Sequence, residues 1–350
     1  MKRSDGNSNG RHVNVLIAET YPQGTLEKWK KQWLVALLVS LQCGVFSVAC
    51  ADPDSDNRNI GLGDSTRGSV RTAREANAVF DAQRAFDMLE RQCAFGPRPP
   101  GSVAHGETQD FLFTELQKYA NSVVLQPLQH KTKTATLKLN NILAEFGPPT
   151  GGETLLLAAH WDTRPIADRD SKIENRDKPI LGANDGASGV AVLLEIARVL
   201  KEHAPPRRVV IVLFDGEDYG PSVEDMFIGS RFFARNLGKW KPDYGILLDM
   251  IGDKDLALPI ERFSWNANRG FTEAIWKRAA TLGLTPFQSR LGDAILDDHV
   301  PLIEVGIPMV NIIDFTYPYW HTVEDTVDKC SPKSLEVVAT LVISIIYDGL

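Results

Sequence analysis

Two adjacent acids follow an apolar run in the second half of the chain. Residues 209–214 are apolar, and Asp215-Gly216-Glu217-Asp218 comes directly after them. The end of a buried strand is where α/β enzymes hold their reactive groups. Neighbouring side chains leave the backbone in different directions, so Glu217 and Asp218 can do different work. One can bind a metal ion while the other transfers protons.

Other polar residues lie at similar places, each at the end of a predicted strand or the start of a predicted helix. They are His160, Trp161 and Asp162, Asn184 and Asp185, Asp249, and Trp320 with His321. Strands of one sheet bring such ends to one edge, so these side chains can converge on a point. Repulsion among so many carboxylates is costly unless a cation balances it. Carboxylate oxygens and imidazole nitrogens suit zinc, so we predict a zinc site.

Taken alone, each of these residues has a simpler explanation. Asp185 could cap a helix, and His321 could be a hydrogen-bonded core histidine. Asp249 is harder to explain in this way, because an unpaired carboxylate inside an apolar strand is costly. The metal prediction therefore depends on the whole set. The remaining candidates are interpreted as structural, since no acidic group of this kind accompanies them: His105, His130 and His203.

The predicted elements alternate between strand and helix. Helical spacing predicts two leading helices between residues 73 and 119, and later helices at 188–203, 230–236, 271–282 and 332–347. Apolar runs predict strands at 122–130, 137–145, 154–159, 209–214, 244–251 and 309–313. This order predicts an α/β fold in a single domain, with a sheet between layers of helices.

Composition narrows the possible partners. The chain has 350 residues, of which 43% are hydrophobic and 24% charged, and this is an ordinary globular composition. A formal net charge of -7 leaves no basic stripe and argues against a nucleic-acid partner. The charged segment 166–180 could shape the entrance to the site, although its composition is more typical of a solvated surface loop. No oligomeric state is predicted.

Residues 1–50 resemble an export signal. Lys28, Lys30 and Lys31 precede an uncharged apolar run over residues 33–49. Cleavage at small residues, lipid attachment at Cys50, and an uncleaved anchor with a span at the short limit for a bilayer all remain open. We expect an exported protein, periplasmic or extracellular, with membrane attachment if Cys50 carries a lipid. We predict that residues 51–73 form a flexible tether and that residues 74–350 form a catalytic domain.

Cysteines are few in the predicted domain. Only Cys93 and Cys330 lie beyond the export signal and Cys50. Export permits a disulfide between them, and two buried free thiols are an equal alternative.

Several motifs together resemble the zinc-dependent aminopeptidase family. In chain order they are His160-x-Asp162, Leu181-Gly182-Ala183-Asn184-Asp185-Gly186-Ala187-Ser188-Gly189, Phe214-Asp215-Gly216-Glu217-Asp218, Gly229-Ser230-Arg231, Leu247-Leu248-Asp249-Met250-Ile251-Gly252 and Trp320-His321-Thr322. Within that family the chain is most similar to the glutaminyl-peptide cyclotransferases. This narrower resemblance rests on residues 95–102, on Asp297-Asp298-His299-Val300-Pro301 and on tryptophan before the last histidine. It implies a central twisted, mostly parallel mixed sheet with helices on both faces.

The resemblance also implies a role for each matched residue. Asp185, Asp218 and His321 would bind one catalytic zinc ion. Asp218 departs from the glutamate of animal cyclases, although aspartate is a competent zinc ligand. Glu217 would be the proton shuttle, and Asp249 and Asp297 would belong to a carboxyl network around it. Trp320 would form a wall of the substrate pocket.

The implied reaction is cyclisation of an N-terminal glutamine on a peptide or protein. Zinc would polarise the γ-carboxamide carbonyl. Glu217 would take a proton from the attacking α-amine and deliver one to departing ammonia, leaving a pyroglutamyl terminus.

Two alternatives stay open. A dinuclear zinc aminopeptidase would use Asp185 as a bridge, with His160 and Asp249 as ligands of a second ion. Asp297 favours the cyclase, because the peptidases tend to carry serine at that position. The other alternative is a non-catalytic exported binding module, which nothing in the sequence requires.

Overall fold

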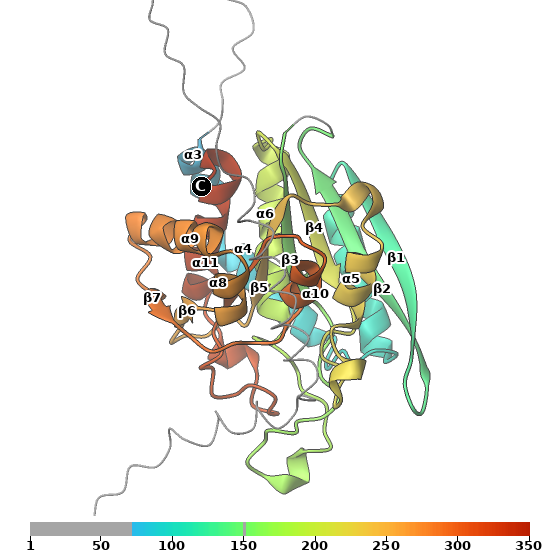
Figure 1. Ribbon diagram of the computed structural model, residues 1–350. Helices are drawn as coiled ribbons and strands as arrows, with labels where there is room; N and C mark the ends of the chain where they lie inside the picture. The colour runs from blue at the N-terminus through green and yellow to red at the C-terminus, as the bar shows by residue number, and fades with distance from the viewer. Residues whose placement is uncertain (1–71, 150–151) are drawn as a thin grey trace, which may run out of the picture. The chain divides into compact units, whose positions relative to one another are not determined.

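The computed structural model describes residues 72–149 and 152–350 of the chain (Figure 1). The predicted export signal, Cys50 and the predicted tether as far as residue 71 lie outside these residues. Among the helices of the described ranges, none is both long and apolar enough to cross a membrane.

A six-stranded sheet forms the centre of the described domain, in the order β1-β2-β4-β3-β5-β8. The strands are β1 (Ser122–Lys131), β2 (Thr136–Phe146), β3 (Thr154–His160), β4 (Arg208–Phe214), β5 (Tyr244–Asp249) and β8 (Met309–Ile313). β2 pairs antiparallel with both β1 and β4, whereas β4, β3, β5 and β8 are parallel to one another. The sheet is therefore mixed and mostly parallel, as predicted.

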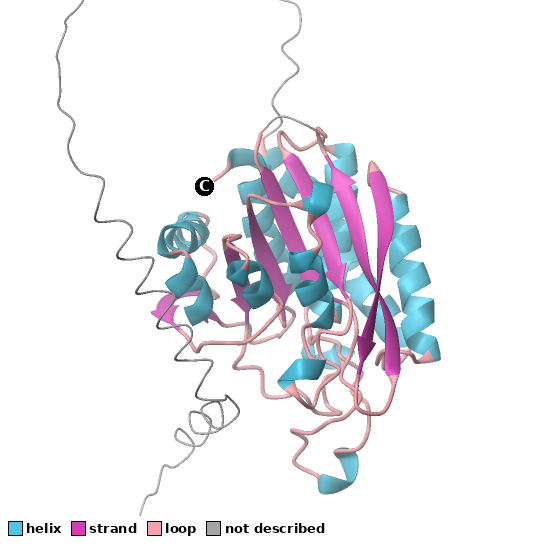
Figure 2. Ribbon diagram, turned by 45° about the vertical axis from the view of Figure 1, so that its right-hand side comes forward, coloured by secondary structure: helices cyan, strands magenta, loops and turns pink. Residues whose placement is uncertain are grey.

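Helices cover both faces of the sheet (Figure 2). They are α3 (Ala73–Val79), α4 (Ala82–Ala94), α5 (Val103–Gln117), α6 (Ala187–Glu202), α7 (Ile228–Arg235), α8 (Arg262–Ala267), α9 (Arg269–Thr281), α10 (His299–Glu304) and α11 (Pro332–Asp348). Short strands β6 (Leu258–Ile260) and β7 (Phe287–Leu291) form a separate parallel pair.

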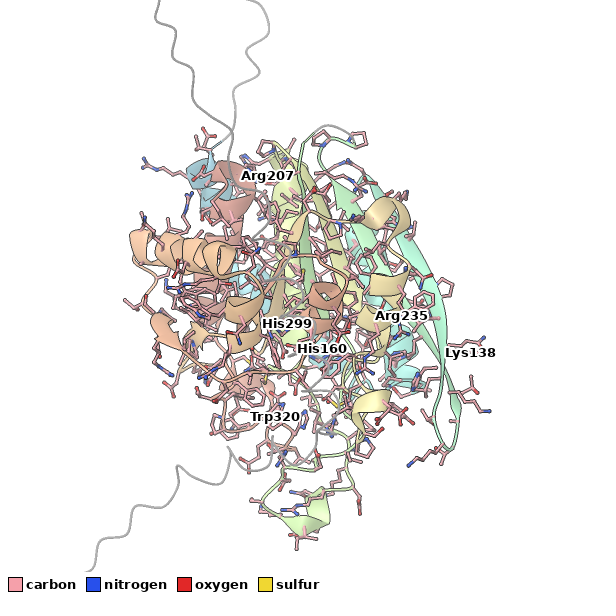
Figure 3. The ribbon with its side chains drawn as sticks, in the orientation of Figure 1. Lys138, His160, Arg207, Arg235, His299 and Trp320 are labelled. Atoms are coloured by element: carbon pink, nitrogen blue, oxygen red, sulfur yellow. The ribbon has the colours of Figure 1, made fainter. Side chains whose placement is uncertain are left out.

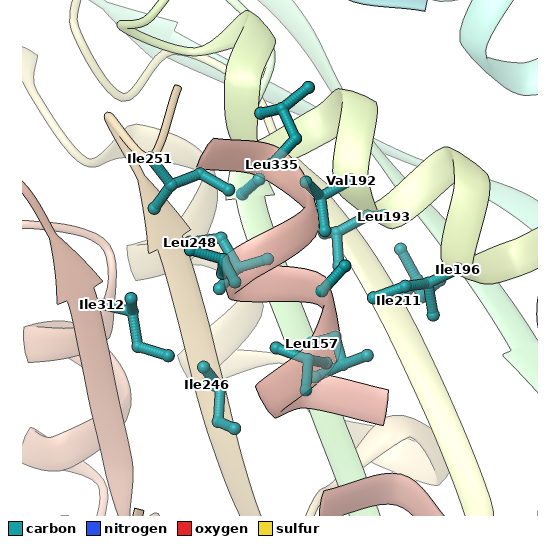
Figure 4. Close-up of a cluster of buried hydrophobic side chains, with 14 of the residues drawn as sticks. Leu157, Val192, Leu193, Ile196, Ile211, Ile246, Leu248, Ile251, Ile312 and Leu335 are labelled. Atoms are coloured by element: carbon teal, nitrogen blue, oxygen red, sulfur yellow. The ribbon is translucent and has the colours of Figure 1, made fainter. Parts of the chain in front are cut away.

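Side chains alternate across the sheet because successive residues of a strand point to opposite faces. On β3, Leu155 and Leu157 pack into the larger core with residues of α6 and α11 (Figure 4). Leu156 faces the other side, in a smaller core that includes Phe233 of α7 and Leu302 of α10. Burial on both faces explains why the parallel strands are almost uniformly apolar in sequence.

The order of the strands creates a switch point between β3 and β5. The chain leaves β3 through α6 and enters β4 on one side, and it later returns to place β5 on the other side of β3. The connections that leave β3 and β5 therefore run in opposite directions along the sheet. A crevice beyond the carboxyl ends of such strands is the usual ligand site of an open α/β sheet.

Some predicted boundaries were wrong. Three helices, rather than two, lead the domain, because Phe80 is extended and Asp81 caps a new helix with its side chain. β5 ends at Asp249 instead of 251, since Met250 has a φ of 47° and turns the chain out of the sheet. The segments β6, β7, α8 and α10 were not predicted.

Gly189 lets α6 lie close to the sheet. A Cβ atom at this position would meet the Leu248 carbonyl oxygen at 2.2 Å and the Ala159 Cβ at 3.0 Å. We expect Gly189→Ala to lower the free energy of unfolding by about 1–3 kcal/mol, measured by urea denaturation, because the backbone of β5 must move.

Gly270→Ala is the matched control, since a Cβ there meets nothing within 4 Å. Near the start of α9 this change should be neutral, or stabilising by up to about 1 kcal/mol. Equal stability of the two variants would show that α6 does not require close approach to β5.

Candidate active site

The structure gathers the sequence-predicted residues at the carboxyl edge of the sheet. His160 ends β3 and Asp249 ends β5, while Glu217 and Asp218 lie in the turn after β4. Asp185 lies two residues before α6, and His321 follows β8 in a long loop. Figure 3 shows His160 near the middle of this edge, with Trp320 in the loops beyond it.

One group of potential ligands consists of Asp185, Asp218 and His321. One ligand atom from each lies within 4.8 Å of the other two, and all three residues are buried. His321 Nε2 is 3.2 Å from Asp218 Oδ2 and 3.7 Å from Asp185 Oδ2. This is the set that the resemblance implies for the catalytic zinc ion, and its role as a ligand set stays a prediction.

A second group shares Asp185 with the first. His160 Nε2 lies 3.1 Å from Asp185 Oδ1 and 3.3 Å from Asp249 Oδ1. Asp185 therefore presents Oδ2 to the first group and Oδ1 to the second, which is the arrangement expected of a carboxylate between two cation positions. The residues of the dinuclear alternative are thus also brought together.

The donor atoms of the first group fit a zinc ion. Ligand atoms about 2.0–2.2 Å from a tetrahedral zinc lie about 3.3–3.6 Å from one another, close to the distances of 3.2 and 3.7 Å found here. Within the described residues, Asp185 Oδ2 and Asp218 Oδ2 are buried and have no hydrogen-bond partner. Such oxygens are costly unless a cation binds them. A zinc ion at this position would satisfy both.

Two buried carboxylates hold the backbone of the turns that carry the acids. Asp162 accepts the N–H groups of Glu217 and Asp218, at 3.0 and 3.2 Å. Asp325 accepts those of Asn184 and Asp185, at 2.9 and 3.1 Å. Each carboxylate uses both oxygens, so it fixes two successive residues of the turn. The neighbouring side chains are therefore aimed by hydrogen bonds to carboxylates elsewhere in the sequence.

The environment of Glu217 suits proton transfer. Burial and the nearby carboxylates of Asp218 and Asp297 raise the pKa of Glu217 well above its ordinary value. A glutamate whose pKa is raised is a stronger proton acceptor than an ordinary carboxylate. In contrast, His321 and Arg164 outweigh the effect of burial on Asp218 and lower the pKa of that residue. The pKa is raised at Glu217 and lowered at Asp218, which matches the suggestion that one acid transfers protons while the other binds a metal ion.

Asp297 lies in a buried polar network beside Asp249. Its Oδ2 accepts a hydrogen bond of 2.7 Å from Asn311 Nδ2. Burial, followed by the negative charge of Asp249, raises the pKa of Asp297 to about 7. Burial and the Asp297 carboxylate likewise raise the pKa of Asp298. Within the described residues, no hydrogen bond joins Asp249 or Asp297 to Glu217. The link between this network and Glu217 is electrostatic, because the charge of Asp297 raises the pKa of Glu217.

Trp320 lies directly against a predicted metal ligand. Its ring stacks on that of His321, with the ring centroids 3.9 Å apart. The Phe315 ring is tilted by 57° relative to the indole, and its centroid lies 4.8 Å away. The indole is half-buried. An aromatic surface next to the ligand set is consistent with the predicted pocket wall, which stays a prediction.

Two of the histidines interpreted as structural do have acidic partners. His105 Nε2 lies 2.8 Å from Asp215 Oδ1, and His130 Nε2 lies 2.6 Å from Asp225 Oδ1. Neither belongs to the two ligand groups. Cys93 and Cys330 are buried free thiols.

Sequence reasoning missed the parts of the site that act through other residues. The clamping carboxylate Asp325 was not identified, and Asp162 was noted without a role. The loop after β3 was only partly predicted. Most of residues 171–179 are exposed, as expected, but Asp170 is buried and Arg164 and Asp168 contact the ligand set. The dense run of Asp and Arg directly after Asp162 was the available signal.

A match to peptidase family M28 spans residues 141–346 and contains all of these site residues. The chain belongs to this family. Its fold matches a glutaminyl cyclase from Tannerella forsythia with a TM-score of 0.74 and 37% identity, over 77% of this chain and 99% of that one. A Zn-dependent exopeptidase from Parabacteroides distasonis gives the same TM-score with 33% identity, over 80% and 100% of the two chains.

Among curated proteins, the chain is similar to the bovine glutaminyl-peptide cyclotransferase. The two are 26% identical over 278 residues, which cover 68% of this chain and 74% of the bovine protein. These findings confirm the predicted fold class and the resemblance drawn from the motifs, including zinc as the metal of the family.

Two buried acids should make the metal-free protein sensitive to pH. Burial raises the pKa of Asp215 to about 6 and that of Asp297 to about 7, from an ordinary value of 3.8. The folded state then binds protons that the unfolded chain releases, so this stabilisation is complete below about pH 4 and is lost as the pH rises towards 7. For chelator-treated protein, we expect these two acids alone to lower the free energy of unfolding in urea by about 2–4 kcal/mol between about pH 5 and pH 8.

Asp297→Asn is the matching variant, because its amide oxygen can still accept the hydrogen bond from Asn311. It should flatten the pH dependence. An unchanged slope would exclude Asp297 as its source.

Proposed function

We propose that this protein is a zinc-dependent glutaminyl-peptide cyclotransferase, which converts an N-terminal glutamine to pyroglutamate and releases ammonia. The observation that carries the proposal is the position of Glu217. It is a buried acid with a raised pKa, adjacent to Asp218 of the ligand group. Relatives named as glutaminyl cyclases, similar over nearly their whole length, support the same activity.

Cyclisation requires one proton to move while one bond forms and another breaks. The α-amine of the glutamine attacks its own side-chain Cδ atom, and the Cδ–Nε bond then breaks. Zinc, when held by Asp185, Asp218 and His321, would draw electron density from the amide oxygen. Glu217 takes the proton that the α-nitrogen loses and gives it to the departing nitrogen, which leaves as ammonia. No water is consumed.

Trp320 and the acids around Glu217 serve this reaction by holding groups in place. The glutamine side chain must fold back on its own amine, and the flat indole beside His321 offers a surface that favours such a compact rotamer. The charge of Asp297 helps to keep the pKa of Glu217 high, and the charge of Asp249 acts on Asp297 in the same way. A base with a high pKa is the stronger proton acceptor.

A zinc aminopeptidase is the second candidate, and one observation favours it. His160, Asp185 and Asp249 form a complete second ligand group, as a second ion would require. The number of ions therefore separates the two candidates: we propose one tightly bound zinc ion for the cyclase, whereas a peptidase would need two.

Glu217→Gln tests the proposed reaction. This variant keeps the shape of the side chain and removes its ability to accept a proton. We expect ammonia release from a glutamine-initiated dipeptide to fall by about 10²–10⁴-fold, with zinc content unchanged. Glu224→Gln changes an exposed acid near the same turn and should retain wild-type activity.

The same assay decides between the candidates when aminoacyl-anilide is added as a second substrate. Two zinc ions for each chain together with anilide cleavage would overturn the cyclase in favour of the peptidase. A wild-type protein that binds zinc but acts on neither substrate would leave only the non-catalytic module.

A further inference from the structure

Arg164 is an unusually buried guanidinium at the edge of the site. It follows β3 in the loop that leads away from His160, and only 4% of its surface is exposed. Its Nη1 donates a 2.7 Å hydrogen bond to Asp218 Oδ1. Its Nε and Nη2 donate to the two oxygens of Asp168, at 2.9 and 3.0 Å. A single planar group thus connects two carboxylates in a fixed geometry.

This contact divides the work of the two Asp218 oxygens. Oδ1 is held by Arg164, whereas Oδ2 lies 3.2 Å from His321 Nε2 and has no hydrogen-bond partner among the described residues. The free oxygen is the one that faces the other potential ligands. Arg164 therefore fixes the rotation of the Asp218 carboxylate and leaves one oxygen available for a cation.

Asp168 connects the same guanidinium to the histidine of the ligand group. Asp168 Oδ1 lies 3.3 Å from His321 Nδ1, while His321 Nε2 faces Asp218 and Asp185. A carboxylate beside the outer nitrogen of a histidine favours the tautomer that leaves the inner nitrogen free for a metal. Asp218, Arg164, Asp168 and His321 thus lie in a ring of close contacts, in which Arg164 donates hydrogen bonds to both carboxylates and each carboxylate lies 3.2 or 3.3 Å from a ring nitrogen of His321.

Backbone contacts from the same loop support the ring. The N–H of Arg169 donates to the carbonyl of His321 at 3.2 Å, and Asp170 Oδ2 accepts the N–H of Val323 at 3.2 Å. His321 has a φ of 55°, a left-handed conformation that a residue other than glycine keeps only when its surroundings impose it. The loop after β3 supplies that constraint.

Space for the guanidinium is also built into the chain. A Cβ atom on Gly220 would lie 2.6 Å from Arg164 Nη1 and 3.0 Å from Arg164 Cζ. Gly220 has a φ of 51°, so glycine suits both the conformation and the close approach. The turn that presents Asp218 therefore continues into a segment shaped around Arg164.

We propose that Arg164 and Asp168 are positioning residues that hold Asp218 and His321 in register and so set the affinity of the site for zinc. This inference rests on the ligand set of the proposed function. Neither residue is required to touch substrate. Loss of either should weaken zinc binding more than it weakens the fold.

Zinc affinity of the full chain, measured by competition with a chromophoric chelator, tests the inference. Asp168→Asn removes the charge beside His321, and Arg164→Lys keeps the charge but loses the planar fork. For each we expect the zinc dissociation constant to rise by about 10–100-fold. Two matched controls should remain within twofold of wild type: Asp177→Asn in the exposed part of the same loop, and Arg269→Lys, which makes the same change in an exposed Arg–Glu pair of the same spacing.

The double variant tests whether the two residues act as one unit. If the ring is the functional element, Arg164→Lys with Asp168→Asn should lose little more affinity than the worse single variant. If the affinity losses of the two single variants multiply in the double variant, Arg164 and Asp168 act independently. That result would overturn the proposal that the ring acts as one unit.

Thermal unfolding of the metal-free proteins controls for folding defects. The Asp168 side chain is about one-third exposed, at 34%, so Asp168→Asn should unfold near the wild-type temperature even if Arg164→Lys does not. Unchanged zinc affinity in a folded Asp168→Asn variant would overturn the inference and leave the proposed function intact. A wild-type protein that binds zinc but releases no ammonia would instead contradict the proposed function. The comparison of zinc affinities between the variants and the wild type would still decide the role of the ring.

Discussion

Burial of many carboxylates at one edge of a sheet is the constraint on which this site depends. These acids are at most 8% exposed, and they comprise Asp185, Glu217, Asp218, Asp249, Asp297 and Asp298. Each would repel the others in a poorly hydrated interior. The protein responds in three ways: some acids gain hydrogen bonds, some have a raised pKa, and some keep buried oxygens that face one another and a histidine. The last response leaves a position for a cation.

Remote parts of the chain hold this arrangement in place. Asp162 fixes the turn of Glu217 and Asp218, and Asp325 fixes the turn of Asp185, in both cases through pairs of backbone N–H groups. Tyr317 in turn donates a 2.7 Å hydrogen bond to Asp325. These clamps act on the backbone, so the acidic side chains remain free to bind a metal or move a proton. The division of work between Glu217 and Asp218 thus follows from surroundings that treat two adjacent residues differently.

Much of the fold could be predicted because the parallel strands are buried on both faces and therefore form continuous apolar runs. The strand over residues 309–313 was predicted without error, and α6 and α11 within one residue at each end. The break at Phe80 and the short strand β6 carry no comparable periodic signal, because a local cap or a tertiary contact decides them. Asp185, Glu217, Asp218 and His321 could be found from their positions at strand and helix ends. Arg164, Asp168 and Asp325 could not, since their roles depend on which distant backbone or side-chain atoms they meet.

Anomalous X-ray scattering at the zinc edge, from crystals of the full protein soaked in zinc, tests the account most directly. We predict one strong peak about 2.0–2.2 Å from Asp185 Oδ2, Asp218 Oδ2 and His321 Nε2. A protein with no peak at these atoms, or with zinc held only by His160 and Asp249, would contradict it.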